Sequence, residues 1–344
     1  MHLKKAYQKR AFRRIGLAIV LVVLVLVFLW LSVISGSNGI RIEETINLFT
    51  CKNQTQTIIY AIRLPRALGA LLVGMLLGLS GVVMQGVLRN PLASPFTLGI
   101  SQAAGFGASL AIIFFNTSTL MNGHWLSVVS VPLFAFTTSM ICSLLIIYLG
   151  KRVGMSPTAL ILAGVGLGSL FHSGTMFLQY FTTEINAAAT LFWTFGDLSK
   201  ATYPVLLVLS GIFLLSFVLV WASHWKFDAL GFGDESAFNK GVNVKTFRIG
   251  MLLFSSLCTA LAVAFFGIIG FIGLVAPHMV RLILGSTHSA LIPLSALGGG
   301  VLLLAADLVA RMMLYPSVLP VGILTSFIGA PMLLYLLVSG KKIK

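Results

Sequence analysis

The sequence predicts an all-α integral membrane protein of about ten transmembrane helices, with both termini in the cytoplasm. Three observations predict it: the composition, the length of the apolar segments, and the distribution of lysine and arginine. The 344 residues are 58% hydrophobic and 9% charged, with a mean hydropathy of +1.02, whereas soluble domains carry about 25% charged residues. The exterior must therefore be apolar as well, and residues 1–344 are expected to form a single transmembrane domain.

Ten apolar segments come close to the roughly 20 residues that a helix needs to cross a hydrocarbon core of about 30 Å. Their period is helical and lacks the alternation of a membrane β-barrel strand. The seventh and eighth segments are separated only by the glycine-rich stretch FFGIIGFIG. The predicted spans are 17–35, 62–87, 94–115, 125–149, 157–182, 201–223, 246–267, 268–284, 288–306 and 320–339.

Lysine and arginine predict the orientation of these spans. If the N-terminus lies inside and the ten spans alternate, 17 of the 23 Lys and Arg residues fall on the cytoplasmic side, as the positive-inside rule requires. The net charge of +15 is therefore mostly a signal of topology. A nucleic-acid-binding surface is a poor interpretation, because the basic residues are spread over many loops instead of one folded face.

Motifs for catalysis are absent from the sequence. It has no GxxxxGK[ST] phosphate-binding loop and no HExxH zinc motif, and its three cysteines are far apart. Secondary transporters usually carry ionisable residues well inside their spans, and here His172 in the fifth span is the main exception. A hydrogen bond to a neighbouring helix is its simple role, and a metal or haem ligand is the alternative. A transport role would therefore need energy from a partner.

A polar break separates the second and third spans on the predicted cytoplasmic side. Within MQGVLRNPLASPFTLGIS (84–101), the dipeptides beginning at Asn90 and Ser94 each resemble an N-cap followed by proline at the first helical position. The same pattern begins at Ser156, where the fifth span starts. Irregular backbone at membrane depth persists only when it is buried in protein or lines a water-filled cavity. The breaks therefore indicate a pore mouth, with ordinary loop-to-helix transitions outside the lipid as the alternative.

The segment 227–247 is the longest polar insert on the predicted cytoplasmic side. Asp234 and Ser236 are suited to cap a short helix there. This helix would have an apolar face with no membrane left to enter, so we interpret it as a docking surface for an energy-supplying partner. A linker that packs against its own bundle is the alternative. The apolar residues are Leu230, Phe232, Ala237, Phe238 and Val242.

Two arginines oppose both charge rules at the outer end of the second span. Arg63 and Arg66 are three residues apart and share a helix face, at an N-terminal end where the helix dipole disfavours cations. An acidic external partner would explain them, and contact with lipid phosphates is the alternative. As rim charges, each is expected to contribute only about 0–1 kcal/mol. Asp307 and Arg311 are four residues apart and should pair on one helix.

Six motifs together resemble the FecCD family, the permease subunits of binding-protein-dependent ABC importers for iron-siderophores, haem and vitamin B12. The resemblance runs from about residue 10 to the C-terminus. The motifs are RLPR (63–66), GLSGVVMQGVLRNPLASPFTLGIS (78–101), ILAGVGL (161–167), GIIGFIGLVAPHMVR (267–281), AADLVAR (305–311) and LPVGILTSFIGAP (319–331).

The resemblance implies a type II ABC importer permease that forms a homodimer, with the pathway at the dimer interface. Two ATPase subunits would dock on the cytoplasmic side and one substrate-binding protein outside. ATP and Mg would then belong to the ATPase, so the chain itself is expected to hold no cofactor and not to be an enzyme. The expected location is the cytoplasmic (inner) membrane of a bacterium or archaeon.

The resemblance also implies roles for individual residues. The arginines that receive acidic residues of the binding protein are matched by Arg63, Arg66 and Arg311. The cytoplasmic gate is matched by Asn90, Leu92, Ser156, Pro157 and Thr158. The short coupling helices that contact the ATPase, in a loop of about 227–245, are matched by Leu230, Phe232, Asp234, Glu235, Ala237, Phe238 and Val242.

The substrate is open at this point. An iron-siderophore is the first expectation, followed by haem or vitamin B12 and then by an oxyanion such as molybdate. Two other function classes stand beside the importer: a secondary transporter working alone, and a membrane-embedded enzyme. The sequence departs from the family pattern at Val318, where a glutamate is common, and at Pro157, which replaces a polar gate residue of some members.

Overall fold

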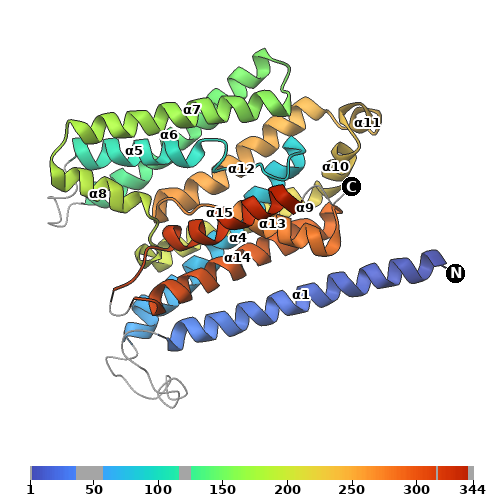
Figure 1. Cartoon of the computed structure of the whole chain (residues 1–344), viewed down its shortest axis with the longest axis horizontal. Coiled ribbons are helices and arrows are strands. Elements are labelled where there is room, and N and C mark those ends of the chain that lie inside the picture. Colours follow the sequence, from blue (N-terminus) through green and yellow to red (C-terminus); the bar gives the residue numbers. More distant parts are fainter. Residues whose placement is uncertain (1, 36–56, 116–124, 315–316, 340–344) are drawn as a thin grey trace.

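A computed structural model describes residues 2–35, 57–115, 125–314 and 317–339 as helices joined by turns, with no strand in these ranges (Figure 1). The longer helices coincide with the ten predicted spans. They are α1 (His2–Ile34), the π-helical turn η1 (Ile59–Arg63) continued by α4 (Leu64–Leu88), α5 (Ile100–Phe114), α6 (Trp125–Arg152), α7 (Pro157–Tyr180), α9 (Tyr203–Ala222), α12 (Val244–Phe266), α13 (Ile272–Leu284), α14 (His288–Met312) and α15 (Val321–Ser339).

Seven of these helices, within the described ranges, are long and apolar enough to cross a membrane. The other three, α5, α13 and α15, are apolar but shorter over their described parts. An all-helical membrane protein is therefore confirmed, and the count of ten crossings stays a prediction. The break between the seventh and eighth spans is real: α12 ends before Gly267 at φ 76°, and α13 begins after Phe271 at φ 65°.

Short helices fill two segments in which hydropathy predicted no span. Between α7 and α9 lie α8 (Glu184–Thr194) and the 3₁₀ turn η2 (Leu198–Lys200). Between α9 and α12 lie α10 (His224–Gly231) and α11 (Asp234–Asn239), which together form the α10–α11 hairpin. The predicted short helix in the cytoplasmic insert is therefore two helices.

The centre of the bundle is the packing of α4 against α14. A Cβ at Gly74 or Gly78 would overlap the backbone of α14 at Gly299 and Ser295, so only glycine permits this approach. Small residues let membrane helices pack closely in this way. In the apolar window of the span Ile59–Leu88, which contains α4, 78% of the residues are buried, whereas 11% are buried in that of α1. The helix α1 lies along the edge of the bundle (Figure 1).

The two ends of the bundle carry different elements. The helix α1 begins and α15 ends at the end where α10 and α11 lie, and α8 lies at the opposite end (Figure 1). We call these the α11 end and the α8 end. The segments predicted to be cytoplasmic thus share the α11 end, which agrees with the predicted topology. The orientation in the membrane stays a prediction.

Candidate functional site

Two arginines, Arg66 and Arg311, pair with Asp307 at the α8 end, and Arg63 lies one helical turn before Arg66; we call these four residues the arginine cluster. Arg66 of α4 donates from Nε to Asp307 Oδ1 of α14, and its Nη2 is equally close, at 2.9 Å. Arg311 Nε lies 3.1 Å from Asp307 Oδ2, an ion-pair contact without hydrogen-bond geometry. Asp307 is fully buried. The predicted pairing of Asp307 with Arg311 is confirmed, and Arg63 completes the cluster.

The arginine cluster also caps the C-terminal end of α1. Arg63 Nη1 donates to the carbonyls of Val33 and Ile34, at 3.0 and 2.8 Å. Arg311 Nη1 donates to the carbonyl of Ser32 at 3.0 Å. The last carbonyls of a helix lack intrahelical donors, and cations complement the dipole at that end. The cluster therefore fixes the otherwise peripheral α1 to the centre of the bundle.

The expectation that these arginines are exposed rim charges is wrong. Arg63 and Arg66 are buried, and the Arg311 side chain is 9% exposed. Their donors are directed inward because Asp307 and the carbonyls at the end of α1 supply acceptors there. Their role in docking a binding protein stays a prediction, and it must act through the remaining charge of the cluster, three cations against one anion.

The break after the second span forms a turn over residues 89–99, the 89–99 turn. Asn90 does not cap a helix: its Oδ1 accepts from the Leu92 N–H at 2.9 Å. Ser94 Oγ accepts from the Thr97 N–H at 3.3 Å, as an N-cap side chain does, and the Ser94 N–H donates to Thr97 Oγ1 at 2.9 Å. Such side chains satisfy nearby backbone groups and stabilise turns. The predicted cap hydrogen bond is therefore present at Ser94, but it stabilises a turn: no helix begins after Asn90 or Ser94, and α5 begins only at Ile100.

A second turn joins α6 to α7 over residues 153–156, the 153–156 turn. Here the N-cap prediction is confirmed, because Ser156 Oγ accepts from the Ala159 N–H at 3.3 Å and Pro157 occupies the first helical turn. Ser156 and Thr158 are exposed. The proposed gate residues therefore lie on two separate turns, and one residue of α12 bonds both to the 153–156 turn and to the end of α4, just before the 89–99 turn.

The residue of α12 that makes these bonds is Arg248. From the sequence it was predicted only to be one of the 17 Lys and Arg residues on the cytoplasmic side. It is buried on α12, one turn after the start of an apolar helix. Its Nε donates to the Val87 carbonyl at the end of α4 at 3.2 Å, and its Nη1 to the Met155 carbonyl at 2.8 Å. Its Nη2 binds Asp234. An arginine inside an otherwise apolar span was the signal that could have identified it.

The α10–α11 hairpin divides its apolar residues between two surroundings. Leu230, Ala237 and Val242 are buried against the bundle, whereas Phe232 and Phe238 are 76% and 71% exposed. The two alternatives, a packed linker and a docking surface, thus each describe part of the segment. The buried residues fix the hairpin, and the two exposed phenylalanines are the part free to contact a partner.

Asp234 does not cap α11, so that prediction is wrong. The residue before α11 is Gly233 at φ 112°, and it makes no side-chain cap. The Asp234 carboxylate instead pairs with Arg89 Nη2 at 3.2 Å and Arg248 Nη2 at 3.1 Å. Two guanidinium groups attract a carboxylate more strongly than a backbone N–H does.

The pair formed by Asp228 of α10 and His288 of α14 holds these two helices together. Asp228 Oδ1 lies 2.8 Å from His288 Nδ1 and accepts from the His288 N–H at 2.9 Å. Burial raises the pKa of Asp228, but the hydrogen bonds and charge of His288, with the charge of His224, outweigh it and leave this pKa below its usual value. The Phe227 ring stacks on His288, with centroids 5.3 Å apart.

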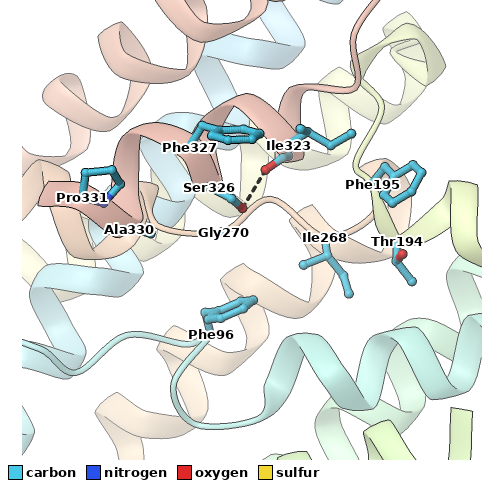
Figure 2. Close-up of a pocket in the computed structure, with 11 residues that line it drawn as sticks. Phe96, Thr194, Phe195, Ile268, Gly270, Ile323, Ser326, Phe327, Ala330 and Pro331 are labelled. Atoms are coloured by element: carbon cyan, nitrogen blue, oxygen red, sulfur yellow. Dashed lines mark hydrogen bonds between the residues drawn. The ribbon is translucent and has the colours of Figure 1, made fainter. Parts of the chain in front are cut away.

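An apolar hollow of about 590 Å³ lies between the 89–99 turn and α15. Figure 2 shows Phe96 facing Phe327 and Ile323 across it. Ser326 Oγ donates to the Gly322 carbonyl at 2.8 Å, so this hydroxyl is already bonded within α15. No lining residue is charged. The lining is Phe96, Thr194, Phe195, Ile268, Gly270, Gly322, Ile323, Ser326, Phe327, Ala330 and Pro331.

His172 has an exposed side chain and lines a separate hollow of about 430 Å³, with Gln102 and Ser169. Within the described ranges, no three His, Cys, Asp or Glu side chains are grouped so that they could hold a metal ion. The alternative of a metal role for His172 is therefore not supported by a three-residue ligand group in this part of the chain.

The family of the chain follows from comparison with known proteins. Residues 23–339 match the model of the FecCD transport family. The chain belongs to the FecCD transport family. This confirms the resemblance carried by the six motifs.

Three relatives of this FecCD permease have names that state a transport role. A provisionally named ABC transporter permease of Methanocaldococcus jannaschii is 41% identical, over 98% of this chain and 98% of its own length. The hemin transport system permease HmuU of Yersinia pestis is 39% identical, over 80% and 81%. The Fe(3+)-citrate import system permease YfmE of Bacillus subtilis is 36% identical, over 97% and 98%.

A solved structure has the same fold as this FecCD permease. It shows an inward-facing ABC transporter provisionally assigned to the metal-chelate type, with a TM-score of 0.78 and 31% identity. The match covers 95% of this chain and 98% of that chain. The chain is thus an ABC transporter permease by family, by relatives and by fold.

Proposed function

We propose that this FecCD permease is the membrane subunit of an ATP-driven importer. It would pass a metal chelate, an iron-siderophore first of all, from an external binding protein to the cytoplasm. The observation that carries the proposal is the α10–α11 hairpin. Its Phe232 and Phe238 are exposed, while its other apolar residues are buried against the bundle. The sequence has no phosphate-binding loop, so the energy must come from a partner that binds there.

Partners complete this function. The proposal is a homodimer with two ATPase subunits at the α11 end, which would face the cytoplasm, and one binding protein at the α8 end. ATP and Mg would be held by the ATPase, and ATP hydrolysis would not occur on this chain. The assembly would lie in the cytoplasmic membrane of a bacterium or archaeon. The positive-inside distribution supports this orientation.

Gate and passage residues follow from the same geometry. We assign the gate to Asn90, Leu92, Ser156, Pro157 and Thr158, on two turns at the α11 end. We assign part of the passage to the hollow beside Phe96, since an uncharged lining suits a cargo that must be released. The arginine cluster is the proposed docking point of the binding protein.

The names of relatives and the lining of the hollow support the substrate class. Relatives are named for hemin and Fe(3+)-citrate, and a bulky chelate suits an apolar passage. Haem, vitamin B12 and an oxyanion such as molybdate are the alternatives. A stand-alone secondary transporter is less well supported, because the buried Asp307 is held between two arginines in the arginine cluster.

A reconstituted importer tests the proposal. The permease, its ATPase and its binding protein are placed in vesicles and offered a ferric siderophore, hemin, cobalamin and molybdate separately. ATP-dependent accumulation of the ferric siderophore is expected, with none when the ATPase is left out. Accumulation of another compound alone would replace the substrate assignment. Accumulation that needs no ATPase would overturn the importer.

A further inference from the structure

One carboxylate at the start of α11 connects three elements. Asp234 accepts from Arg248 Nη2 through both oxygens, at 3.1 and 3.3 Å, and pairs with Arg89 Nη2 at 3.2 Å. Arg89 is the first residue of the 89–99 turn, and Arg248 is on α12. The α10–α11 hairpin is thus joined by its own side chain to the end of α4.

Arg248 extends the connection to the second turn. While Nη2 binds Asp234, Nε donates to the Val87 carbonyl and Nη1 to the Met155 carbonyl. The guanidinium presents its donors in a rigid, planar fork, so a shift that keeps one bond strains the others. Any displacement of Asp234 therefore acts on the 153–156 turn through Arg248 and on the 89–99 turn through Arg89.

The backbone is strained at both points of contact. Arg89 has φ 47° and Met155 has φ 57°, and these are two of the three non-glycine residues with positive φ in the described ranges. Such residues persist only where their surroundings hold them, and they are concentrated at switch regions. Here the Arg89 side chain is held by Asp234, and the Met155 carbonyl by Arg248.

The hairpin also has space in which to move. An open hollow of about 660 Å³ separates α11 from the 153–156 turn and the start of α12. Asp234, Glu235 and Phe238 line one side of it, and Gly154 and Met155 line another. A partner bound to the exposed Phe238 would therefore press α11 toward or away from the 153–156 turn.

We propose that the cluster of Asp234, Arg248 and Arg89 transmits movement of the α10–α11 hairpin to both gate turns at once. This inference rests on the proposed function, because the ATPase is the partner that moves the hairpin. While Asp234 is engaged, the two strained turns keep their present form. When α11 shifts, these contacts break, and the 89–99 turn and the 153–156 turn change conformation together. Asp234, Arg248 and Arg89 are positioning residues.

The test replaces Asp234 by asparagine in the complete importer, with ATPase and binding protein present. Cysteine is placed at Leu92 in one series and at Thr158 in another, and labelling by a thiol reagent is measured with and without nucleotide. In the otherwise unaltered importer, both positions should respond to nucleotide. With Asp234→Asn the ATPase should still co-purify, but the response should be lost at both positions and uptake should fall to background.

A matched control is Lys151→Gln, which removes an exposed charge at the end of α6, close to the 153–156 turn. It should leave the labelling responses and uptake intact. Arg89→Gln is the second variant, since it removes the ion pair with Arg89 and keeps the pair of Asp234 with the buried Arg248. It should weaken the response at Leu92, and it supplies the test if Asp234→Asn fails to assemble.

The outcomes separate the inference from the function on which it rests. Nucleotide responses that survive Asp234→Asn at both positions, or are lost at one only, overturn the common link. If Asp234→Asn fails to assemble, an unchanged response at Leu92 in Arg89→Gln overturns it instead. Failure of the unaltered permease to bind the ATPase overturns the proposed function instead, and it is seen before any residue of the cluster is changed.

Discussion

Arg66 and Asp307, 241 positions apart in the sequence, form a buried ion pair that joins α4 to α14 at the α8 end. The contact is 2.9 Å and involves two nitrogens of the guanidinium. It adds a charged contact to the glycine-mediated packing of the same two helices. It also orients the arginine cluster, on which α1 depends.

Arg66→Ala should destabilise the protein by about 3–5 kcal/mol, because removing one partner leaves a buried charge poorly compensated. Thermal unfolding of the purified permease in detergent measures the effect. Arg13→Ala, which removes an exposed arginine of α1, is the control and should change little. Equal stability of both variants would show that Asp307 is adequately neutralised by Arg311 alone.

Charge at the α8 end should set the rate at which the binding protein associates. The wild-type association rate should fall as salt rises, since screening shortens the reach of the cluster. The combined change Arg63→Glu and Arg66→Glu should slow association and remove most of the salt dependence. The rates are measured on monodisperse protein only, because both residues are buried. If the double variant folds and its association rates are unchanged, the arginine cluster has a structural role only.

Phe232→Asp combined with Phe238→Asp should detach the ATPase. Each exposed ring is expected to contribute about 1.5–3 kcal/mol when buried at the contact, so the loss of both weakens binding strongly. Co-purification of the ATPase measures it. Thermal unfolding of the permease should stay unchanged, since neither ring is packed in the bundle. Leu230→Asp, at a fully buried position, should instead reduce stability.

Asp228 should make the attachment of α10 sensitive to acid. Its pKa is lower in the folded protein than its usual 3.8, so the ionised carboxylate contributes stability that is fully present above the unfolded pKa. This contribution is lost as the pH falls through the folded pKa, below about pH 4. Tryptophan fluorescence of Trp221 and Trp225 during acid titration should report it. Asp228→Asn should abolish that part of the transition, and an identical titration would contradict the assignment.

Local signals in the sequence predicted the fold well. The length and period of the apolar segments identified the helices, and the cap at Ser156 was predicted from Ser-Pro alone. The same dipeptide at Ser94 makes the same hydrogen bond, to the Thr97 N–H, but a turn follows it and α5 begins only at Ile100. A cap motif predicts the hydrogen bond of its side chain, and the residues that follow decide whether a helix begins.

Contacts between distant segments were not predictable from the sequence. The role of Asp234 depends on Arg89 and Arg248, which only the folded bundle brings to it. The arginines 63 and 66 were correctly singled out as exceptional, but their exposure was misjudged because their acceptors lie on α1 and α14. Charge rules identify unusual residues, whereas partners far away in the chain decide their surroundings.

Cross-linking of Leu92→Cys to its symmetry mate tests the central claim most directly. The variant permease, with its ATPase, is treated with a thiol cross-linker without nucleotide, with ATP, and with ADP. If the 89–99 turn belongs to a gate driven by the ATPase in a homodimer, the yield of cross-linked dimer should change between nucleotide states. The same yield in every state would contradict the account.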